Sequence, residues 1–254
     1  MPLKKPVTNQ PELHRVSLLL GEKAAAALEQ TRVIVIGLGG VGSWAAEALV
    51  RSGIGSITIV DNDTVSPSNI NRQLQALPGT VGLPKAAALM QRLLEINPHC
   101  DVSAFNKIFS LETAPLFGME KDGYVIDAID SFPHKLDLIQ FACGKAILFS
   151  SMGMAQKTDP TRIKTADIWN TRGCPLARLV RQSLKKRGFA GHFTTVYSDE
   201  LFTGKNENHN AGLPRGPELG SMVPVTAAAG MALASLVIND VYRTTIGRPL
   251  NEGA

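Results

Sequence analysis

The chain has 254 residues, of which 44% are hydrophobic and 19% are charged. This is the composition of an ordinary globular protein, and it excludes a disordered, collagen-like or fibrous chain. The net charge of +4 is compatible with an anionic partner such as RNA or a nucleotide but does not identify one. The three cysteines are scattered and include no CxxC pair, so we expect neither a disulfide framework nor a structural zinc site.

The N-terminal region, residues 1–22, is expected to form an arm or a short helix that leads into the fold. It has no continuous apolar core followed by a cleavage site, so its pattern is not that of a signal peptide. The longest apolar run, at 222–238, is shorter than the ~20 residues of a membrane span, and we interpret it as a buried helix. We therefore expect a cytoplasmic protein with no membrane partner.

Apolar and β-branched runs alternate with helical patterns from residue 22 to residue 150. Strands are expected at 32–36, 56–60, 101–109, 124–129 and 146–150, and helices at 22–30, 43–51, 84–96 and 132–143. Short apolar runs of this kind are typical of parallel strands that are buried on both faces. The alternation predicts an α/β fold with a Rossmann-like, doubly wound, mostly parallel sheet.

The pattern after residue 150 is less regular. A strand at 162–169 is expected to point away from the sheet, followed by a basic amphipathic helix at 175–187 and a strand at 192–196. The polar, Gly/Pro-rich stretch at 203–220 predicts a mobile loop. Because no linker and no internal repeat divides the chain, we expect one domain over residues 1–254.

A glycine-rich turn lies between the first predicted strand and the helix that follows it. Gly37, Gly39 and Gly42 have GxGxxG spacing, and Gly40 belongs to the same turn. Such glycines allow close approach of the backbone to a ligand, and the helix N-terminus offers free N–H groups to phosphate or ribose oxygens. Asp61 ends the next strand, where its carboxylate can accept both hydroxyls of a ribose. Together these features predict a nucleotide-binding site.

Further polar residues indicate which nucleotide chemistry follows. Arg72, in the amide-rich segment SNINRQ at 68–73, and Lys85 can neutralise phosphate charge. Asp130 ends a predicted strand and can hold a magnesium ion that bridges phosphate oxygens. The set predicts a triphosphate with Mg²⁺. Taken singly, Arg72 could form a surface ion pair, Lys85 could be a solvated helix start and Asp130 could be a helix N-cap.

These motifs resemble the ubiquitin-activating-like adenylating enzymes of the ThiF/MoeB/HesA type. The matching elements are GLGGVGS at 37–43, Asp61 with Asp63, SNINRQ at 68–73, Lys85 and DAIDS at 127–131. The resemblance implies a ThiF/MoeB-type C-terminal extension and ATP as the substrate of an adenylation. It implies that Asp61 holds the ribose and that Asp130 binds Mg²⁺. The residues that it implies for gripping the phosphates are Asn69, Arg72, Gln73 and Lys85.

The resemblance also implies a homodimer, in which an arginine near the N-terminus reaches the phosphates of the partner's site. Arg15 is the candidate for this role. Arg15 would complete the implied catalytic set, whose other members are Arg72, Lys85 and Asp130.

Within the family, the chain is most similar to the branch of tRNA threonylcarbamoyladenosine dehydratases. The fragments that select this branch are DPTRIKTADI at 159–168, PLARLVRQSLKKRG at 175–188 and VYSDE at 196–200. The similarity implies ATP-dependent dehydration of N6-threonylcarbamoyladenosine in tRNA by carboxylate adenylation and cyclisation. It also suggests a sulfur-mobilising partner protein. Some relatives bind a monovalent cation, Na⁺ or K⁺, around the turn at 150–155.

Other functions remain open at this point. Adenylation of the C-terminus of a ubiquitin-like sulfur-carrier protein or peptide is the main alternative, although such activators generally carry two CxxC pairs and this chain has none. Cys174 is the one thiol outside the nucleotide core segments, in a loop that we interpret as exposed. A degenerate nucleotide-binding module would lose the phosphate-gripping residues. An NAD-dependent oxidoreductase would leave the SNINRQ segment unexplained.

The basic helix at 175–187 is the candidate RNA-binding element. Arg178, Arg181, Lys185 and Lys186 recur along it and could contact tRNA phosphates. A solvated helix face has the same pattern. We expect tRNA, and not DNA, as the nucleic-acid partner.

Overall fold

The computed structural model describes residues 10–119, 123–201 and 219–247. The loop predicted at 203–220 lies outside the described residues except for its last two positions, and so does the N-terminal arm before residue 10. Of that arm, the structure describes helix α1 (His14–Leu20), which packs against α2 (Glu22–Gln30).

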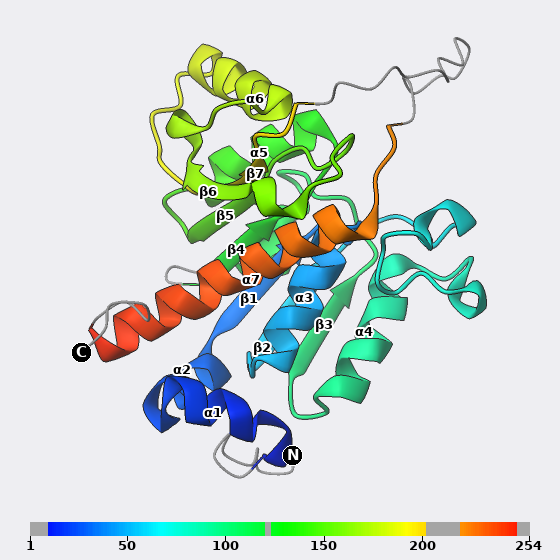
Figure 1. Cartoon of the computed structure of the whole chain (residues 1–254), viewed down its shortest axis with the longest axis vertical. Helices are drawn as coiled ribbons and strands as arrows, with labels where there is room; N and C mark the ends of the chain where they lie inside the picture. The colour runs from blue at the N-terminus through cyan, green and yellow to red at the C-terminus, as the bar shows by residue number, and fades with distance from the viewer. Residues whose placement is uncertain (1–9, 120–122, 202–218, 248–254) are drawn as a thin grey trace.

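Seven strands form one sheet in the order β3-β2-β1-β4-β5-β7-β6 (Figure 1). All neighbouring strands pair in parallel except β6, which is antiparallel to β7. Their bounds are β1 (Arg32–Ile36), β2 (Ser56–Val60), β3 (Asp101–Phe105), β4 (Tyr124–Asp127), β5 (Ile147–Ser151), β6 (Ile163–Asp167) and β7 (Thr194–Ser198). The predicted doubly wound, mostly parallel sheet is therefore confirmed.

Helices cover both faces of the sheet and build a separate core on each. Alternate residues of β1 divide between the cores: Val33 and Val35 pack on one face, and Ile34 and Ile36 on the other. The first core holds side chains of α2, α3 (Gly42–Arg51), α4 (Lys85–Ile96) and α7 (Val223–Ile246), and the second those of α5 (Phe132–Ala142) and α6 (Pro175–Lys186). Burial on both faces is the reason why these strands are continuous apolar runs in the sequence.

Several predicted elements end earlier than the sequence indicates. The strand expected at 101–109 stops at Phe105, and the strand expected at 124–129 stops at Asp127. After Phe105 the chain continues to Phe109 and Phe117, which are buried in the second core without belonging to a strand. Apolar residues in a packed connection cannot be distinguished from strand residues by pattern alone.

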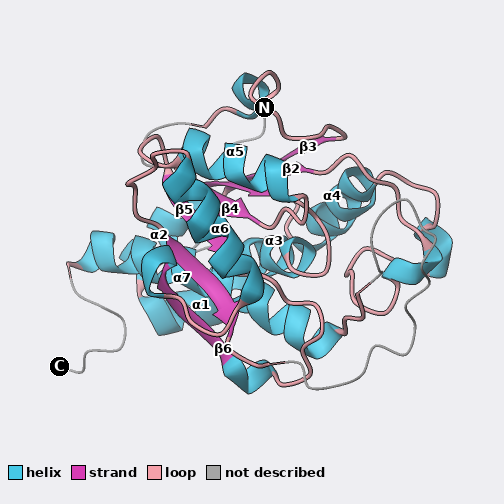
Figure 2. Cartoon of the chain, turned by 90° about the horizontal axis from the view of Figure 1, so that it is seen from above, coloured by secondary structure: helices cyan, strands magenta, loops and turns pink. Residues whose placement is uncertain are grey.

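The strand expected at 162–169 does not point away from the sheet, so that prediction is wrong. It forms β6, the edge strand, in which Ile163 pairs with Ser198 and Asp167 pairs with Thr194 of β7. Its exposed side chains suit an edge position, because only one neighbour covers an edge strand. Figure 2 shows β6 beside α6.

Helix α7 is longer than the predicted run at 222–238 and extends to Ile246. It is long and apolar enough to span a membrane by length and composition, with a mean hydropathy of 1.4 over an 18-residue window. In the structure it lies lengthwise along α3 and also contacts α2, β5 and β7 (Figure 1). Val225, Ala229, Leu233 and Val237 recur at helical spacing and are buried on this side. These contacts are those of the buried helix that the sequence predicts.

Candidate active site

The glycine turn lies at the carboxyl end of β1, between β2 and β4. The chain leaves this point toward β2 on one side and β4 on the other, which makes it the switch point where open α/β sheets bind ligands. Gly37 has a φ of +90°, and a Cβ there would lie 2.5 Å from the carbonyl oxygen of Ala128. A Cβ on Gly42 would lie 1.8 Å from the carbonyl oxygen of Gly37. Both positions therefore require glycine for packing.

Gly39 and Gly40 have more open surroundings. A Cβ on Gly39 would meet no atom within 4 Å, whereas one on Gly40 would lie 3.1 Å from Thr226 and 3.2 Å from Cγ of Arg72. Helix α3 begins two residues later, at Gly42; in its first turn the Ser43 N–H donates to the Gly39 carbonyl and the Ala45 N–H donates to the Val41 carbonyl. The open face at Gly39 and the positive end of the α3 dipole form a cradle that fits a nucleotide phosphate.

Asp61 follows β2 and is held by two backbone amides. Its Oδ2 accepts a hydrogen bond from the Leu38 N–H at 2.6 Å, and its Oδ1 accepts one from the Asp63 N–H at 2.8 Å. Burial raises the pKa of Asp61 above its ordinary value, although the positive charge of Lys85 and the two amides act in the opposite direction. The amides orient the carboxylate beside the glycine turn, as a ribose-binding acid requires.

Lys85 is not a solvated helix start. Its side chain is only 7% exposed, and its ammonium group binds Oδ2 of Asp63 at 2.8 Å, while Asp63 itself is 61% exposed. The backbone N–H of Lys85 also donates to the carbonyl of Asp63. The structure thus brings Asp61, Asp63 and Lys85 together beside the glycine turn.

The SNINRQ segment contributes an arginine that is free of ion pairs among the described residues. Nη1 of Arg72 donates to the Ser68 carbonyl and to Oδ1 of Asn71, both at 2.9 Å. This arrangement does not support the surface ion pair considered for Arg72. The guanidinium lies on carbonyl and amide oxygens, which a phosphate can replace as hydrogen-bond acceptor.

Asn69 and Gln73 are buried rather than open to a ligand. Asn69 caps its own turn, because its Oδ1 accepts a hydrogen bond from the Ser66 N–H at 3.0 Å. Oε1 of Gln73 has no hydrogen-bond partner among the described residues, and the same holds for Oε1 of Gln75. Direct phosphate contacts by Asn69 and Gln73 therefore remain predictions.

Asp130 lies on the exposed side of the turn that follows β4. It is not the N-cap of α5, since that position belongs to Ser131. No group of three or more acidic, histidine or cysteine side chains among the described residues could enclose a metal. One carboxylate completed by phosphate oxygens and water is the donor set that Mg²⁺ uses on nucleotides, and Asp130 fits it.

Two buried partners of this site are not evident from the sequence. Nε2 of Gln75 donates to the carbonyl of Leu38 at 2.8 Å, so the Leu38 residue is held by Gln75 on one side and Asp61 on the other. Asp127, three residues before Asp130, binds the ammonium group of Lys135 at 2.7 Å. The sign of Asp127 in the sequence is that it is an acid within the apolar run YVIDAI at 124–129.

Arg15 is not part of this site within one chain. Leu13, just before α1, packs against Gly53 beyond the C-terminal end of α3, whereas the glycine turn precedes the N-terminal end. The ten residues of α3 separate these two ends by roughly 15 Å. Arg15 is exposed there, and two leucines of the same helix, Leu18 and Leu19, are more than 70% exposed.

The basic residues of α6 divide into bound and free side chains. Arg181 donates to the hydroxyl of Thr171, and the Lys185 ammonium group lies 5.9 Å from the centre of the Trp169 ring. Arg178 and Lys186 are exposed and form no ion pair with a described residue. The opposite side of the helix is buried in the second core through Ala177, Val180 and Leu184.

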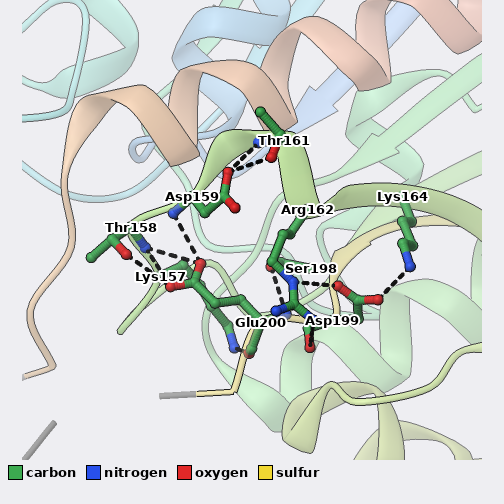
Figure 3. Close-up of polar contacts among 9 residues, drawn as sticks. All are labelled: Lys157, Thr158, Asp159, Thr161, Arg162, Lys164, Ser198, Asp199 and Glu200. Carbon is green, nitrogen blue, oxygen red and sulfur yellow. Dashed lines mark hydrogen bonds and ion pairs between the residues drawn. The ribbon is translucent and has the colours of Figure 1, made fainter. Parts of the chain in front are cut away.

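Two of the three branch-selecting fragments, 159–168 and 196–200, meet at one end of the β6–β7 pair (Figure 3). Glu200 accepts hydrogen bonds from the N–H groups of Thr158 and Asp159 at 3.0 Å, and its carbonyl accepts one from Lys157. These bonds lower the pKa of Glu200, the Asp159 amide most strongly. The fragments at 159–168 and 196–200 therefore fold as one structural unit.

Asp199 forms a second part of this unit. Its carboxylate pairs with Nε of Arg162 at 2.9 Å and with the ammonium group of Lys164, both from the β6 side. The hydrogen bonds from these two cations lower the pKa of Asp199. Arg162 and Lys164 are thus engaged in the fold rather than free for an anionic ligand.

Cysteine chemistry finds no support in the described residues. Cys100 and Cys174 are buried, and Cys143 is half-buried with a pKa that burial raises. The loop that holds Cys174 is exposed at Arg172 and Gly173, but Cys174 itself is buried, because it occupies the N-cap position of α6 and packs in the second core. A reactive cysteine needs an accessible thiol with a lowered pKa; Cys100 and Cys174 are buried, and Cys143 is shifted in the opposite direction.

Comparisons with known proteins agree with this geometry. The ThiF family model matches residues 13–251. A tRNA threonylcarbamoyladenosine dehydratase of Bacillus subtilis is 44% identical over 190 residues, which cover 74% of this chain and 75% of the relative. A molybdopterin-synthase adenylyltransferase of Escherichia coli is 38% identical over 106 residues, which cover 41% of this chain and 42% of that protein.

A solved structure extends the similarity over nearly the whole chain. The crystal structure of the E. coli tRNA N6-threonylcarbamoyladenosine dehydratase TcdA in complex with ATP has a TM-score of 0.83 at 33% sequence identity. The match covers 93% of this chain and 96% of that one. The E. coli enzyme has also been solved in complex with AMP. By its sequence motifs, its fold and these matches, the chain belongs to the ThiF family.

Proposed function

We propose that this protein is an ATP-dependent enzyme that dehydrates N6-threonylcarbamoyladenosine in tRNA. The observation that carries the proposal is the arrangement at the carboxyl end of β1, where Asp61, Lys85 and Arg72 surround the open face of the glycine turn. An adenylating site requires an acid for the ribose and cations for the phosphates. Relatives that are similar over most of the chain are named as this dehydratase.

The chemistry begins with the threonine carboxylate of the modified nucleoside. One carboxylate oxygen attacks the α-phosphorus of ATP, a bond to that phosphorus forms, and pyrophosphate leaves. The ureido group of the same nucleoside then attacks the activated carbonyl carbon, a ring closes, and AMP leaves with the carboxylate oxygen. The sum is the loss of one water from the nucleoside and the cleavage of ATP to AMP and pyrophosphate.

The protein contributes orientation and charge to these steps. Asp61 fixes the ribose, and the positive end of the α3 dipole, Lys85 and Arg72 stabilise charge on the phosphate oxygens. Mg²⁺, held by Asp130, would supply further neutralisation of the triphosphate when bound. No step needs a covalent bond to the protein, which is compatible with the burial of Cys100 and Cys174.

A homodimer is part of the proposal. Arg15 lies at the opposite end of α3 from its own glycine turn, so it can serve a phosphate site only in a second copy of the chain. Leu18 and Leu19, exposed on the same short helix, are apolar side chains that a partner would cover. The test is to mix Arg15→Ala with Asp130→Ala chains, since only a cross-dimer site restores activity in the mixture.

The remaining expectations stand as proposals of the family resemblance. We place tRNA on the exposed basic side chains of α6 and the enzyme in the cytoplasm with its substrate. A monovalent cation would lie at the turn after β5, where Gln156 adopts a φ of +58°. Melting curves in Na⁺, K⁺ and a bulky organic cation test it. Co-purification of a persulfide-carrying protein tests the sulfur-mobilising partner.

The decisive assay is a single turnover with modified tRNA, ATP and Mg²⁺, followed by digestion of the RNA and mass analysis of the nucleosides. The proposal predicts ATP-dependent loss of one water from the modified nucleoside, abolished in Asp130→Ala. An unchanged nucleoside, together with pyrophosphate exchange that appears only when a carrier protein with a Gly-Gly terminus is added, would instead establish carrier adenylation.

A further inference from the structure

Asp127 forms a buried polar cluster that the proposed chemistry does not use. It ends β4, and its side chain is completely buried. Its Oδ2 accepts hydrogen bonds from the ammonium group of Lys135 at 2.7 Å and from the hydroxyl of Ser150 at 2.6 Å. Lys135 and Ser150 are themselves buried, with 1% of the Lys135 side chain exposed. We call Asp127, Lys135 and Ser150 the β4 cluster.

A buried ion pair of this kind contributes little net stability. Removing two charges from water costs about as much as their attraction returns, so apolar side chains of similar volume are often equally stable there. What the β4 cluster supplies is geometry, because it ties together three elements: Lys135 belongs to α5, and Ser150 belongs to β5. Each element adjoins the turn that follows Asp127.

The other carboxylate oxygen of Asp127 acts on that turn directly. Oδ1 accepts a hydrogen bond from the Ile129 N–H at 3.1 Å, which closes an Asx turn over residue 128. The Ala128 N–H donates to the carbonyl of Ile36 at 2.8 Å, and the Ala128 carbonyl is the group that leaves no room for a side chain at Gly37. Asp130 follows immediately and is exposed. One short turn therefore bounds the glycine motif and presents Asp130 to solvent.

We propose that Asp127 is a positioning residue for the metal-binding carboxylate, with Lys135 and Ser150 fixing its rotamer. The ammonium and hydroxyl groups hold Oδ2, which leaves Oδ1 aimed at the Ile129 amide. The turn then has one conformation, and the Asp130 carboxylate has one direction relative to the phosphate cradle. The inference rests on the proposed function in one respect, namely that Asp130 binds the divalent ion of the nucleotide.

The choice of variant follows from burial. Asp127→Asn would leave the Lys135 charge buried and unpaired, which endangers folding. Ser150→Ala removes one hydrogen bond to Asp127 and keeps the ion pair. Thr195→Val is the matched control: Thr195 pairs with Ser150 in the β5–β7 register, is equally buried, and loses a hydroxyl that donates only to the Ala166 carbonyl.

The experiment measures binding of Mn²⁺, by electron paramagnetic resonance, to the full-length protein with a non-hydrolysable ATP analogue. Ser150→Ala should weaken Mn²⁺ binding by about three- to tenfold. This corresponds to part of the free energy of one hydrogen bond to a charged group. Hydrogen exchange of the amides at 128–130 should become faster in the same variant. Thr195→Val should leave both readouts at wild-type values while lowering the melting temperature to a comparable extent.

The outcomes separate this inference from the proposed function. If Asp130→Asn weakens Mn²⁺ binding and Ser150→Ala does not, the β4 cluster is structural only and the inference is overturned. If Asp130→Asn leaves Mn²⁺ binding unchanged, Asp130 does not bind the metal, and the inference is overturned as well. Neither readout uses tRNA, so a protein that binds the metal as described but leaves the modified nucleoside unchanged contradicts only the proposed function.

Discussion

The two halves of the sheet hold their functional segments in place by different means. In the half formed by strands β1 to β4, called the β1–β4 half, the backbone holds the segments. Gly37, Gly42 and the Ala128 carbonyl approach so closely there that a single methyl group would not fit. In the β5–β7 half, charged side chains do it, with Glu200 and Asp199 bonded to the segment before and within β6 (Figure 3). Close backbone packing tolerates no substitution, whereas exposed polar side chains can be removed one at a time.

The difference matches what each half would bind. A nucleotide has a fixed shape and needs N–H groups and an acid at set positions, which a rigid turn supplies. An RNA surface presents phosphates that flexible Lys and Arg side chains can follow. We therefore expect single substitutions in the β1–β4 half to cause large losses of stability or nucleotide binding. Single substitutions in the β5–β7 half should cause smaller losses.

The largest effect should come from Gly42→Ala. The new Cβ would lie 1.8 Å from the Gly37 carbonyl, so the turn must move, and we expect a loss of about 3 kcal/mol or more of unfolding free energy. Gly39→Ala is the matched control, because its Cβ meets no atom. It should keep stability within about 1 kcal/mol and weaken ATP binding about tenfold by entering the phosphate cradle. Chemical denaturation and calorimetry measure both, and equal stability of the two variants would refute the backbone account.

Asp61→Asn should separate stability from binding. Burial raises the folded-state pKa of Asp61. Ionisation of this group therefore destabilises the fold as the pH rises above the ordinary pKa of an aspartate. The amide removes this cost, but its NH₂ group replaces one of the two oxygens that accept backbone N–H bonds, so the melting temperature at pH 7 should change little. ATP affinity should fall about 10- to 100-fold, through the loss of charged hydrogen bonds to the ribose. Unchanged affinity would remove Asp61 from the nucleotide site.

A side-chain ion pair within the β1–β4 half provides an intermediate case. Burial by itself raises the pKa of Glu47 on α3, but hydrogen bonds from Arg92 of α4 and from Arg51 outweigh burial and lower it below 4.5. A lowered folded-state pKa stabilises the fold above pH 4.5, and this stabilisation disappears as pH falls through the folded value.

Arg92→Met should therefore cost about 1–2 kcal/mol at pH 7. The difference from the wild-type protein should narrow below pH 4.5. Urea unfolding across pH measures it, with Arg51→Met as a milder control because Arg51 is more exposed. A difference that does not depend on pH would assign the effect to weaker packing instead of the ion pair.

Glu200→Ala should produce a smaller and local change. Hydrogen bonds from the Asp159 and Thr158 amides lower the Glu200 pKa, so the stabilisation that they provide is present at neutral pH and disappears on acidification. We expect faster hydrogen exchange at 157–159 and unchanged ATP affinity. A decrease in ATP binding would show that the two halves are coupled and would contradict the prediction that they act independently.

The smallest effect per residue is expected on α6. Arg178→Ala and Lys186→Ala remove exposed charges, and the removal of each phosphate-binding side chain should lower the salt dependence of tRNA binding by about one unit of slope. Arg187→Ala is the control, because Arg187 is bound to Asp137 at 2.7 Å. Filter binding across salt concentrations measures the slopes. Identical slopes in all three variants would place tRNA elsewhere.

The parallel half of the fold could be predicted from the sequence because burial on both faces leaves a direct pattern. The bounds of β1 and β2 agree with the predicted strands at 32–36 and 56–60. The position of β6 could not be predicted, since its neighbour β7 follows only after α6 and an antiparallel edge strand has no distinctive pattern. The glycine turn and Asp61 could be placed beforehand because spacing along a strand–turn–helix fixes them in space.

Other site features depend on contacts that a motif does not encode. The motif DAIDS contains two acids, and only the structure shows that Asp127 is buried with Lys135 while Asp130 is exposed. The ion pair of Lys85 with Asp63 and the burial of Cys174 are likewise tertiary facts. Spacing indicates which residues share an edge of the sheet, but not which of them are paired with each other.

In the proposed reaction, the carboxylate of the nucleoside is activated as an adenylate. The most direct measurement is a single turnover on tRNA whose threonylcarbamoyladenosine carboxylate carries ¹⁸O. We expect one labelled oxygen in the phosphate group of AMP, because the attacking oxygen stays on phosphorus when the ring closes. Label that appears in water or inorganic phosphate, with unlabelled AMP, would contradict it.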